Sequence, residues 1–303
     1  MTYRSKWSYG GHLLKGQRAA LPVVSNEEDH SIVMFSSRDS MGRSYGLCSS
    51  LISLFPPKVG EPRLVLKHGN PGSFDVAGVM PMQSIEGYLF YIGWTLRKDV
   101  PYFNYSCISE KRGNSYKKIG PILGPDIYES GFSSFFHAVK YEDRYLGYYL
   151  SVIDWSNDEK GNLNPNYDIK IAESNDLINW KRLNLTAISL NKDEAGIGAI
   201  SIIKHQKIFH AWFSVRKGKN FRDDPSGGYR IEHATSHDGI LWSRDKNYSI
   251  MPGDFVGSEK MAAYPSVYIA GESVIIFFNG NGFGEDGIFW CHMPLNELLG
   301  ANE

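Results

Sequence analysis

The chain has 303 residues, of which 42% are hydrophobic and 21% are charged, and this balance excludes a disordered chain. Its 32 Lys and Arg against 33 Asp and Glu leave a net charge of -1, so no basic excess predicts nucleic acid or an anionic membrane as a partner. No apolar run approaches the roughly 18 residues that span a bilayer, and residues 1–14 lack the apolar segment of a secretory signal. We therefore expect a cytoplasmic protein with no membrane partner.

Aromatic residues make up 14% of the chain and, together with 31 Gly and 14 Pro, favour short strands over long helices. In chain order, apolar strands are predicted in pairs. The pairs are residues 18–24 and 32–38, 77–83 and 89–95, 134–140 and 145–151, 198–204 and 208–214, and 262–268 and 274–280. Only residues 294–300 have a helical pattern.

A repeat of about 60 residues organises these strands. Residues 167–183 match residues 229–245 at seven positions with a constant offset of 62, beginning with Tyr167 and Tyr229. Weaker copies begin at Tyr45 and Tyr105, and a degenerate copy begins at Gly287. Each copy follows one strand pair, so the repeating unit is a four-stranded antiparallel sheet.

Five such sheets predict an all-β fold, a five-bladed β-propeller, in which stacking around an axis buries both faces of each sheet. The whole chain, 1–303, is expected to form one domain. The predicted blades are approximately residues 18–55, 75–118, 132–183, 195–245 and 259–293. The alternative is a pair of β-sandwiches with an accidental internal similarity.

Two copies of the repeat carry an Asp followed four residues later by a Trp, at Asp176 and Asp238. A carboxylate there can accept backbone N–H groups of its own turn, and the indole can pack that turn against the blade. We interpret this element as structural and exclude it from the site.

The innermost strands of a propeller begin at the mouth of its central channel. Asp75, Glu194 and Glu259 each lie six residues before the matching position of such a strand. Carboxyl groups that meet in one cavity suit glycosyl transfer, because one protonates the leaving oxygen and another stabilises charge or activates a nucleophile. The alternative is that these acids form salt bridges and cap the blade entries. His137, on a third inner strand, is either a site residue or a packed histidine.

Basic, aromatic and amide side chains are also predicted at this end of the strands. Arginine binds carboxylate or phosphate with two hydrogen bonds, and a flat ring can stack on a sugar. Salt bridges or solvation for the arginines, and core packing for the rings, are the alternatives. The candidates are Arg18, Arg38, Arg97, Arg216, Arg230, Trp94, Trp155, Tyr167, Tyr264, Asn279 and Asn281. No metal or cofactor motif accompanies them.

Several segments carry a resemblance to a known group of proteins. They are FDVAGVMP (74–81), LFYIGWT (89–95) with VPYFNYS (100–106), SEKMAAYPSV (258–267) and FFNGNGFGEDG (277–287). Over about residues 18–293 the chain resembles five-bladed glycosidase-like proteins found in polysaccharide biosynthesis loci, similar to glycoside hydrolase families 43, 32 and 130.

The resemblance implies that Asp75, Glu194 and Glu259 are the acids of the pocket. Arg18 stands where families 43 and 32 usually place an Asp, which argues against simple hydrolysis. Family 130 enzymes use one acid with inorganic phosphate as the nucleophile, which suits a pocket rich in arginine.

The sequence therefore predicts a carbohydrate-active enzyme that cleaves or transfers a glycosyl unit in the central pocket, without a cofactor. The expected ligand is a sugar or sugar phosphate, whose anionic part Arg18, Arg38 and Arg97 bind. A non-catalytic sugar-binding or scaffold propeller is the alternative. The sequence leaves open the sugar, the stereochemical outcome and the oligomeric state.

Overall fold

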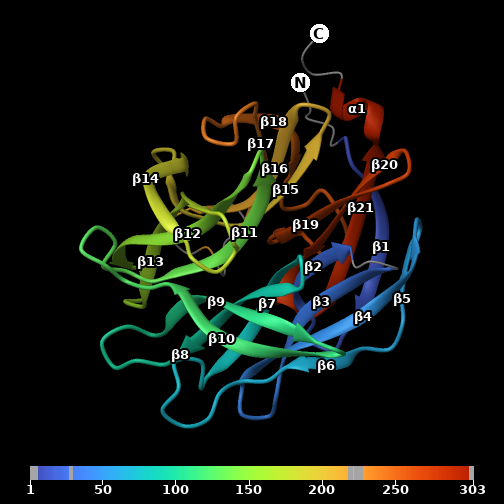
Figure 1. Ribbon diagram of the computed structural model, residues 1–303. Coiled ribbons are helices and arrows are strands. Elements are labelled where there is room, and N and C mark those ends of the chain that lie inside the picture. The colour runs from blue at the N-terminus through green and yellow to red at the C-terminus, as the bar shows by residue number, and fades with distance from the viewer. Residues whose placement is uncertain (1–5, 27–29, 218–220, 222–227, 300–303) are drawn as a thin grey trace.

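The computed structural model describes residues 6–26, 30–217, 221 and 228–299. These residues form antiparallel sheets that surround a common centre (Figure 1). Single parallel pairings, Ser44 with Gly78 and Tyr167 with Gly196, connect the first sheet to the second and the third sheet to the fourth.

The strands follow the chain from sheet to sheet. The first sheet has β2 (Ala20–Asn26), β3 (Ser31–Arg38), β4 (Ser44–Leu54), β5 (Pro57–Val59) and β6 (Arg63–Leu66), and the second has β7 (Gly78–Ile85), β8 (Tyr88–Thr95), β9 (Phe103–Arg112) and β10 (Ser115–Leu123). The third has β11 (Ser133–Tyr141), β12 (Arg144–Asn157), β13 (Leu163–Ser174) and β14 (Lys181–Ile188), and the fourth has β15 (Glu194–His205), β16 (Ile208–Lys217), β17 (Arg230–Ser236) and β18 (Ser243–Ile250).

The fifth sheet joins the two ends of the chain. It contains β19 (Ala263–Ala270), β20 (Ser273–Asn279) and β21 (Gly287–Pro294), and its outer strand is β1 (Ser8–Lys15). A 3-10 helix, η1 (Asn281–Gly284), links β20 to β21, and the short helix α1 (Leu295–Leu299) follows β21. The contribution of β1 was not predicted from the sequence, since residues 8–15 lie outside the repeat.

The inner strands β2, β7, β11, β15 and β19 contact one another in a closed ring. The predicted all-β propeller is therefore confirmed, with its sheets radiating from these strands (Figure 1). Apolar side chains from neighbouring sheets fill each of the five interfaces. Representative buried pairs are Met34 and Tyr91, Phe90 and Phe136, Tyr148 and Phe209, Trp212 and Ile276, and Phe277 and Phe35.

Side-chain hydrogen bonds also link the inner strands around the ring. One polar side chain on each inner strand accepts a backbone N–H of the next inner strand, over 2.7 to 3.3 Å, which satisfies donors that no sheet ladder reaches. The acceptors are Ser25, Gln83, His137, Ser201 and Ser266. His137 is thus a structural acceptor for Ile202, and burial lowers its pKa to about 4.

The repeated Asp and Trp form the turn that the sequence predicts. Asp176 Oδ1 accepts the N–H groups of Ile178 and Asn179 at 2.9 and 2.7 Å, and Trp180 Nε1 donates to a carbonyl of the same turn. Asp238 and Trp242 form the same contacts one repeat later. No helix in the described part of the chain is both long and apolar enough to cross a membrane.

Candidate functional site

Two cavities lie along the ring of inner strands. The entry cavity, about 460 Å³, borders the beginnings of β2, β7, β11 and β19, and the exit cavity, about 330 Å³, borders the later parts of the inner strands. Leu21, Phe135 and Tyr264 line both cavities, with φ angles of 55°, 51° and 60°. This left-handed conformation falls at breaks in strand register, where a β-bulge redirects side chains toward the centre.

Aromatic rings supply much of the wall of the entry cavity. Trp94 on β8 is fixed by a 2.7 Å hydrogen bond from its Nε1 to Ser44 Oγ. The rings of Phe135 and Tyr264 are stacked, with centroids 5.9 Å apart. Rings held in this way can pack on the apolar face of a sugar. The other lining rings are Tyr102, Phe132, Tyr167, Phe221, Tyr229 and Phe283.

Three arginines line the same cavity. Arg18 precedes β2, Arg38 ends β3, and Arg216 lies near the end of β16. The guanidinium of Arg38 lies 5.3 Å from the centroid of Trp94 and donates to the Gly42 carbonyl at 2.7 Å. Arg216 is only 1% exposed, and its Nη2 donates to the carbonyl of Pro165.

These three arginines differ in their partners from most of the other described arginines, although Arg63 also binds a carbonyl and not a carboxylate. Among the residues that the structure describes, no carboxylate forms an ion pair with Arg18, Arg38 or Arg216. Seven arginines outside the cavity do have such a partner: Arg43, Arg97, Arg112, Arg144, Arg182, Arg230 and Arg244. Within the described residues, the cavity therefore concentrates positive charge that no carboxylate pairs with, which favours an anionic ligand.

Polar residues that sequence reasoning missed also line the cavity. Glu285 follows η1 and is the one carboxylate among the described lining residues. Asn104 on β9 and Ser134 on β11 are buried there. The glycine-rich run at 279–287 contributes two asparagines to the predicted site. Glu285 lies in the same run, so its position there could have identified it as a candidate. Asn104 faces Trp94 across the β8–β9 pair, and only the strand register reveals this.

The structure places Asp75 away from the entry cavity. Its buried carboxylate forms an ion pair with Lys118 on β10 and accepts a hydrogen bond from Ser73 Oγ at 2.9 Å. Asp75 therefore forms an internal ion pair of the second sheet with Lys118.

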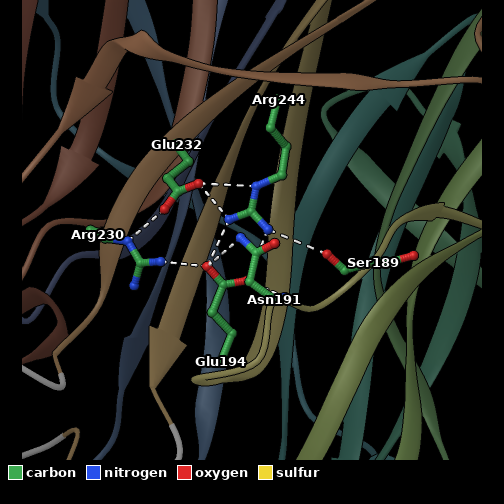
Figure 2. A network of polar contacts seen from close by, with 6 residues as sticks. All are labelled: Ser189, Asn191, Glu194, Arg230, Glu232 and Arg244. Carbon is green, nitrogen blue, oxygen red and sulfur yellow. Dashed lines mark hydrogen bonds and ion pairs between the residues drawn. The ribbon is translucent and has the colours of Figure 1, made fainter.

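Glu194 lies in a network of charges within the fourth sheet (Figure 2). Its carboxylate accepts Arg230 Nη2 at 2.5 Å and both Nη atoms of Arg244 at 2.8 Å, while Glu232 binds the same two arginines. Burial disfavours its charge, but the hydrogen bonds from Arg244 and from the Asn191 N–H hold the pKa of Glu194 below its ordinary value. Glu194 is thus a permanently charged member of a structural network.

Glu259 lies in the turn before β19. It accepts the Gly257 N–H at 2.9 Å and the amide of Asn281 at 2.6 Å, and these hydrogen bonds lower the pKa of its carboxyl group. The structure therefore does not bring Asp75, Glu194 and Glu259 together: each binds groups near its own blade entry, and none lines the entry cavity. The geometry therefore does not support a shared catalytic role for the three acids. Equal spacing before a strand does not determine the direction in which the preceding loop points a side chain.

Six of the eleven predicted binding residues line the entry cavity: Arg18, Arg38, Trp94, Tyr167, Arg216 and Tyr264. The other five do not. Arg97 pairs with Asp99 at the surface, Trp155 packs on Tyr102 and Phe132, and Arg230 binds Glu194 and Glu232. Asn279 binds the backbone of Ala19, Leu21 and Gly287, and Asn281 binds Glu259 and the Lys260 N–H.

The described residues contain no cluster of three or more His, Cys, Asp or Glu side chains that could hold a metal ion.

Solved structures with similar folds are carbohydrate-active proteins. A glycoside hydrolase aligns with 96% of this chain and 92% of its own, at 14% identity and a TM-score of 0.71. A thermostable family-43 glycoside hydrolase aligns over 92% and 89%, at 15% identity and a TM-score of 0.66. A structure from the GH130 family of mannoside phosphorylases, described as containing glycoside hydrolases that target β-1,2 mannosidic linkages, aligns over 93% and 85%, at 12% identity and a TM-score of 0.61.

No protein-family model and no curated protein matches the sequence. The predicted resemblance to propeller glycosidases is confirmed at the level of fold.

Proposed function

We propose that this propeller is a carbohydrate-active enzyme that binds a sugar with an anionic group in the entry cavity and cleaves or transfers its glycosyl unit. The observation that carries the proposal is the set of cavity arginines, Arg18, Arg38 and Arg216, none of which forms an ion pair with a carboxylate of the described residues. A cavity with cations and aromatic rings suits a phosphorylated, nucleotide-linked or acidic sugar better than a neutral one. The similarity in fold to glycoside hydrolases and to the GH130 structure supports the same class.

The single carboxylate of the described cavity lining favours one type of reaction. Hydrolysis of a glycoside by the common mechanisms requires two carboxyl groups flanking the bond, and Glu285 is the one that the described lining provides. A reaction with a single acid matches this lining. An oxygen of inorganic phosphate attacks the anomeric carbon, the glycosidic C–O bond breaks, and the leaving oxygen takes the proton of Glu285.

In this reaction Arg18 and Arg38 bind the attacking phosphate and its product, a sugar phosphate, while the buried Arg216 adds positive charge to the wall. The same lining also fits a transferase whose donor carries the phosphate. We also propose that the protein is cytoplasmic and acts in polysaccharide metabolism, where such substrates are available.

A non-catalytic sugar-binding propeller is the second candidate, because the described lining lacks the second carboxyl group that the common mechanisms of glycoside hydrolysis require. The two candidates differ in the role of Glu285. If the protein is an enzyme, Glu285→Gln should abolish turnover but still bind the ligand. If it is a binding protein, the wild type shows no turnover.

Ligand binding is tested by titration calorimetry with inorganic phosphate, glucuronate, a nucleotide sugar and a neutral methyl glycoside. We expect the anionic compounds to bind and the neutral glycoside to bind more weakly or not at all. Arg38→Gln should weaken anion binding about 10- to 100-fold, because a hydrogen-bonded charge is lost. Arg97→Gln is the matched control, since Arg97 pairs with Asp99 outside the cavity. Equal binding of neutral and anionic compounds, or equal effects of the two substitutions, would contradict the proposal.

A further inference from the structure

The two best-matched repeats bring their first tyrosines together in the wall of the entry cavity. Tyr167 on β13 and Tyr229 just before β17 have their hydroxyl oxygens 2.5 Å apart, and both are 7% exposed. The oxygens therefore share one hydrogen. Two hydroxyl groups carry two hydrogens, so the second must point elsewhere.

Arg216 determines the direction of this hydrogen-bond chain. Its Nε–H donates to Tyr167 Oη at 3.1 Å, and its guanidinium lies 5.0 Å from the centroid of the Tyr167 ring. With a cationic donor on that oxygen, Tyr167 directs its own O–H toward Tyr229. The hydrogen left over is then that of Tyr229, for which the described residues provide no further acceptor.

The surroundings keep both rings in place. A Cβ atom at Gly196 would lie 2.5 Å from the Tyr167 ring, so the ring occupies space that only glycine leaves free. Tyr229 packs edge-on against Phe221 and Phe283, with centroids 5.7 and 5.8 Å away. Burial, together with the neighbouring Tyr167, raises the pKa of Tyr229 well above its ordinary value, so it remains a protonated donor.

We propose that Tyr229 donates its hydroxyl hydrogen to an anionic oxygen of the ligand in the entry cavity, and that Tyr167 and Arg216 are positioning residues that orient and polarise this donor. Successive hydrogen bonds from a cation strengthen one another, so the terminal hydroxyl is a stronger donor than an isolated tyrosine. The inference rests on the proposed function, because it assigns a contact to the anionic part of the same ligand.

The test measures binding of inorganic phosphate and, separately, of glucuronate, which distinguishes a phosphate oxygen from a sugar carboxylate. Wild type, Tyr229→Phe, Tyr167→Phe and the double variant are titrated. Tyr268→Phe is the matched control, because Tyr268 is also 7% exposed and donates to the Leu54 carbonyl at 2.9 Å outside the cavity. Thermal unfolding of each variant confirms that it is folded.

We expect Tyr229→Phe to weaken binding of one of the two anions about 10-fold. Tyr167→Phe should weaken it several-fold although it does not touch the ligand, and the double variant should lose no more than Tyr229→Phe alone. The ultraviolet difference spectrum of tyrosine that accompanies binding should shrink in Tyr229→Phe and persist in Tyr268→Phe.

The outcomes separate this inference from the proposed function. Binding of an anion that Tyr229→Phe leaves unchanged overturns the inference alone. Additive losses in the double variant show that Tyr167 acts independently and overturn its positioning role. If wild type binds none of the anionic compounds, the proposed function and the inference are both wrong.

Discussion

Replacing His137 by Gln should make the protein more resistant to acid. The imidazole of His137 accepts the Ile202 N–H in the ring of inner-strand hydrogen bonds, and burial lowers its pKa from 6.5 to about 4. Gln83 occupies the corresponding place on β7 and accepts the Ala138 N–H at 2.7 Å. A glutamine can therefore retain the hydrogen bond while it removes the titrating group.

The magnitude follows from the difference in proton binding. Between pH 6.5 and about 4 the unfolded chain binds a proton at this histidine that the folded chain does not. The stabilisation is complete above pH 6.5 and is lost as the pH falls, by about 2.5 kcal/mol near pH 4.5. Because His137 lines the exit cavity, water there would reduce this loss.

The assay is urea unfolding near pH 7 and near pH 4.5 for wild type, His137→Gln and the control His237→Gln, whose side chain is exposed. Wild type should lose up to about 2.5 kcal/mol more of its unfolding free energy than His137→Gln between the two conditions. His237→Gln should follow wild type. An equal loss in wild type and His137→Gln would refute the assignment of His137 as a partly buried, neutral acceptor.

Three further substitutions test the site and its supports. Glu194→Gln should lower the unfolding free energy by about 1 to 3 kcal/mol, measured by urea titration, because Arg230 and Arg244 are left with Glu232 as their one shared counter-ion in this network; a stable variant would show that the network is dispensable. Glu285→Gln should abolish turnover of a glycosyl substrate while Glu259→Gln, outside the cavity, retains it, and equal rates would exclude Glu285 as the acid. Gly196→Ala should lower the melting temperature by the equivalent of about 1 to 3 kcal/mol and weaken anion binding, since its methyl group collides with Tyr167; unchanged binding would show that the ring can move freely.

The fold was largely predictable because the repeated residues form contacts within their own turns. The Asp and Trp of each turn satisfy their own backbone, so they recur wherever a blade needs that turn. The N-terminal strand β1 was not predicted, because its partner β21 lies at the other end of the chain and no local pattern encodes that pairing.

Part of the site was predictable from positions within strands, although Trp155, Glu194, Arg230 and Asn279 also lie in strands and do not line the cavity. Arg38, Trp94 and Arg216 belong to β3, β8 and β16, where alternation and register determine the face of each residue. Arg97 lies beyond the end of β8, and the chain there directs it to Asp99 instead. Asp75 and Glu259 lie in loops whose course depends on distant partners, and Glu194 at the start of β15 binds arginines of its own sheet, so none of the three lines the entry cavity.

The pairing of β1 with β21 has a consequence for biosynthesis. On the ribosome, residues 8–15 are made long before their partner strand at residues 287–294. Residues 8–15 must therefore remain without this partner while residues 16–286 are made, and the largely exposed side chains of β1 make that delay tolerable. The fifth sheet can close only after residues 287–294 have been made, and nascent chains stalled before residue 287 should be far easier to digest than the folded protein.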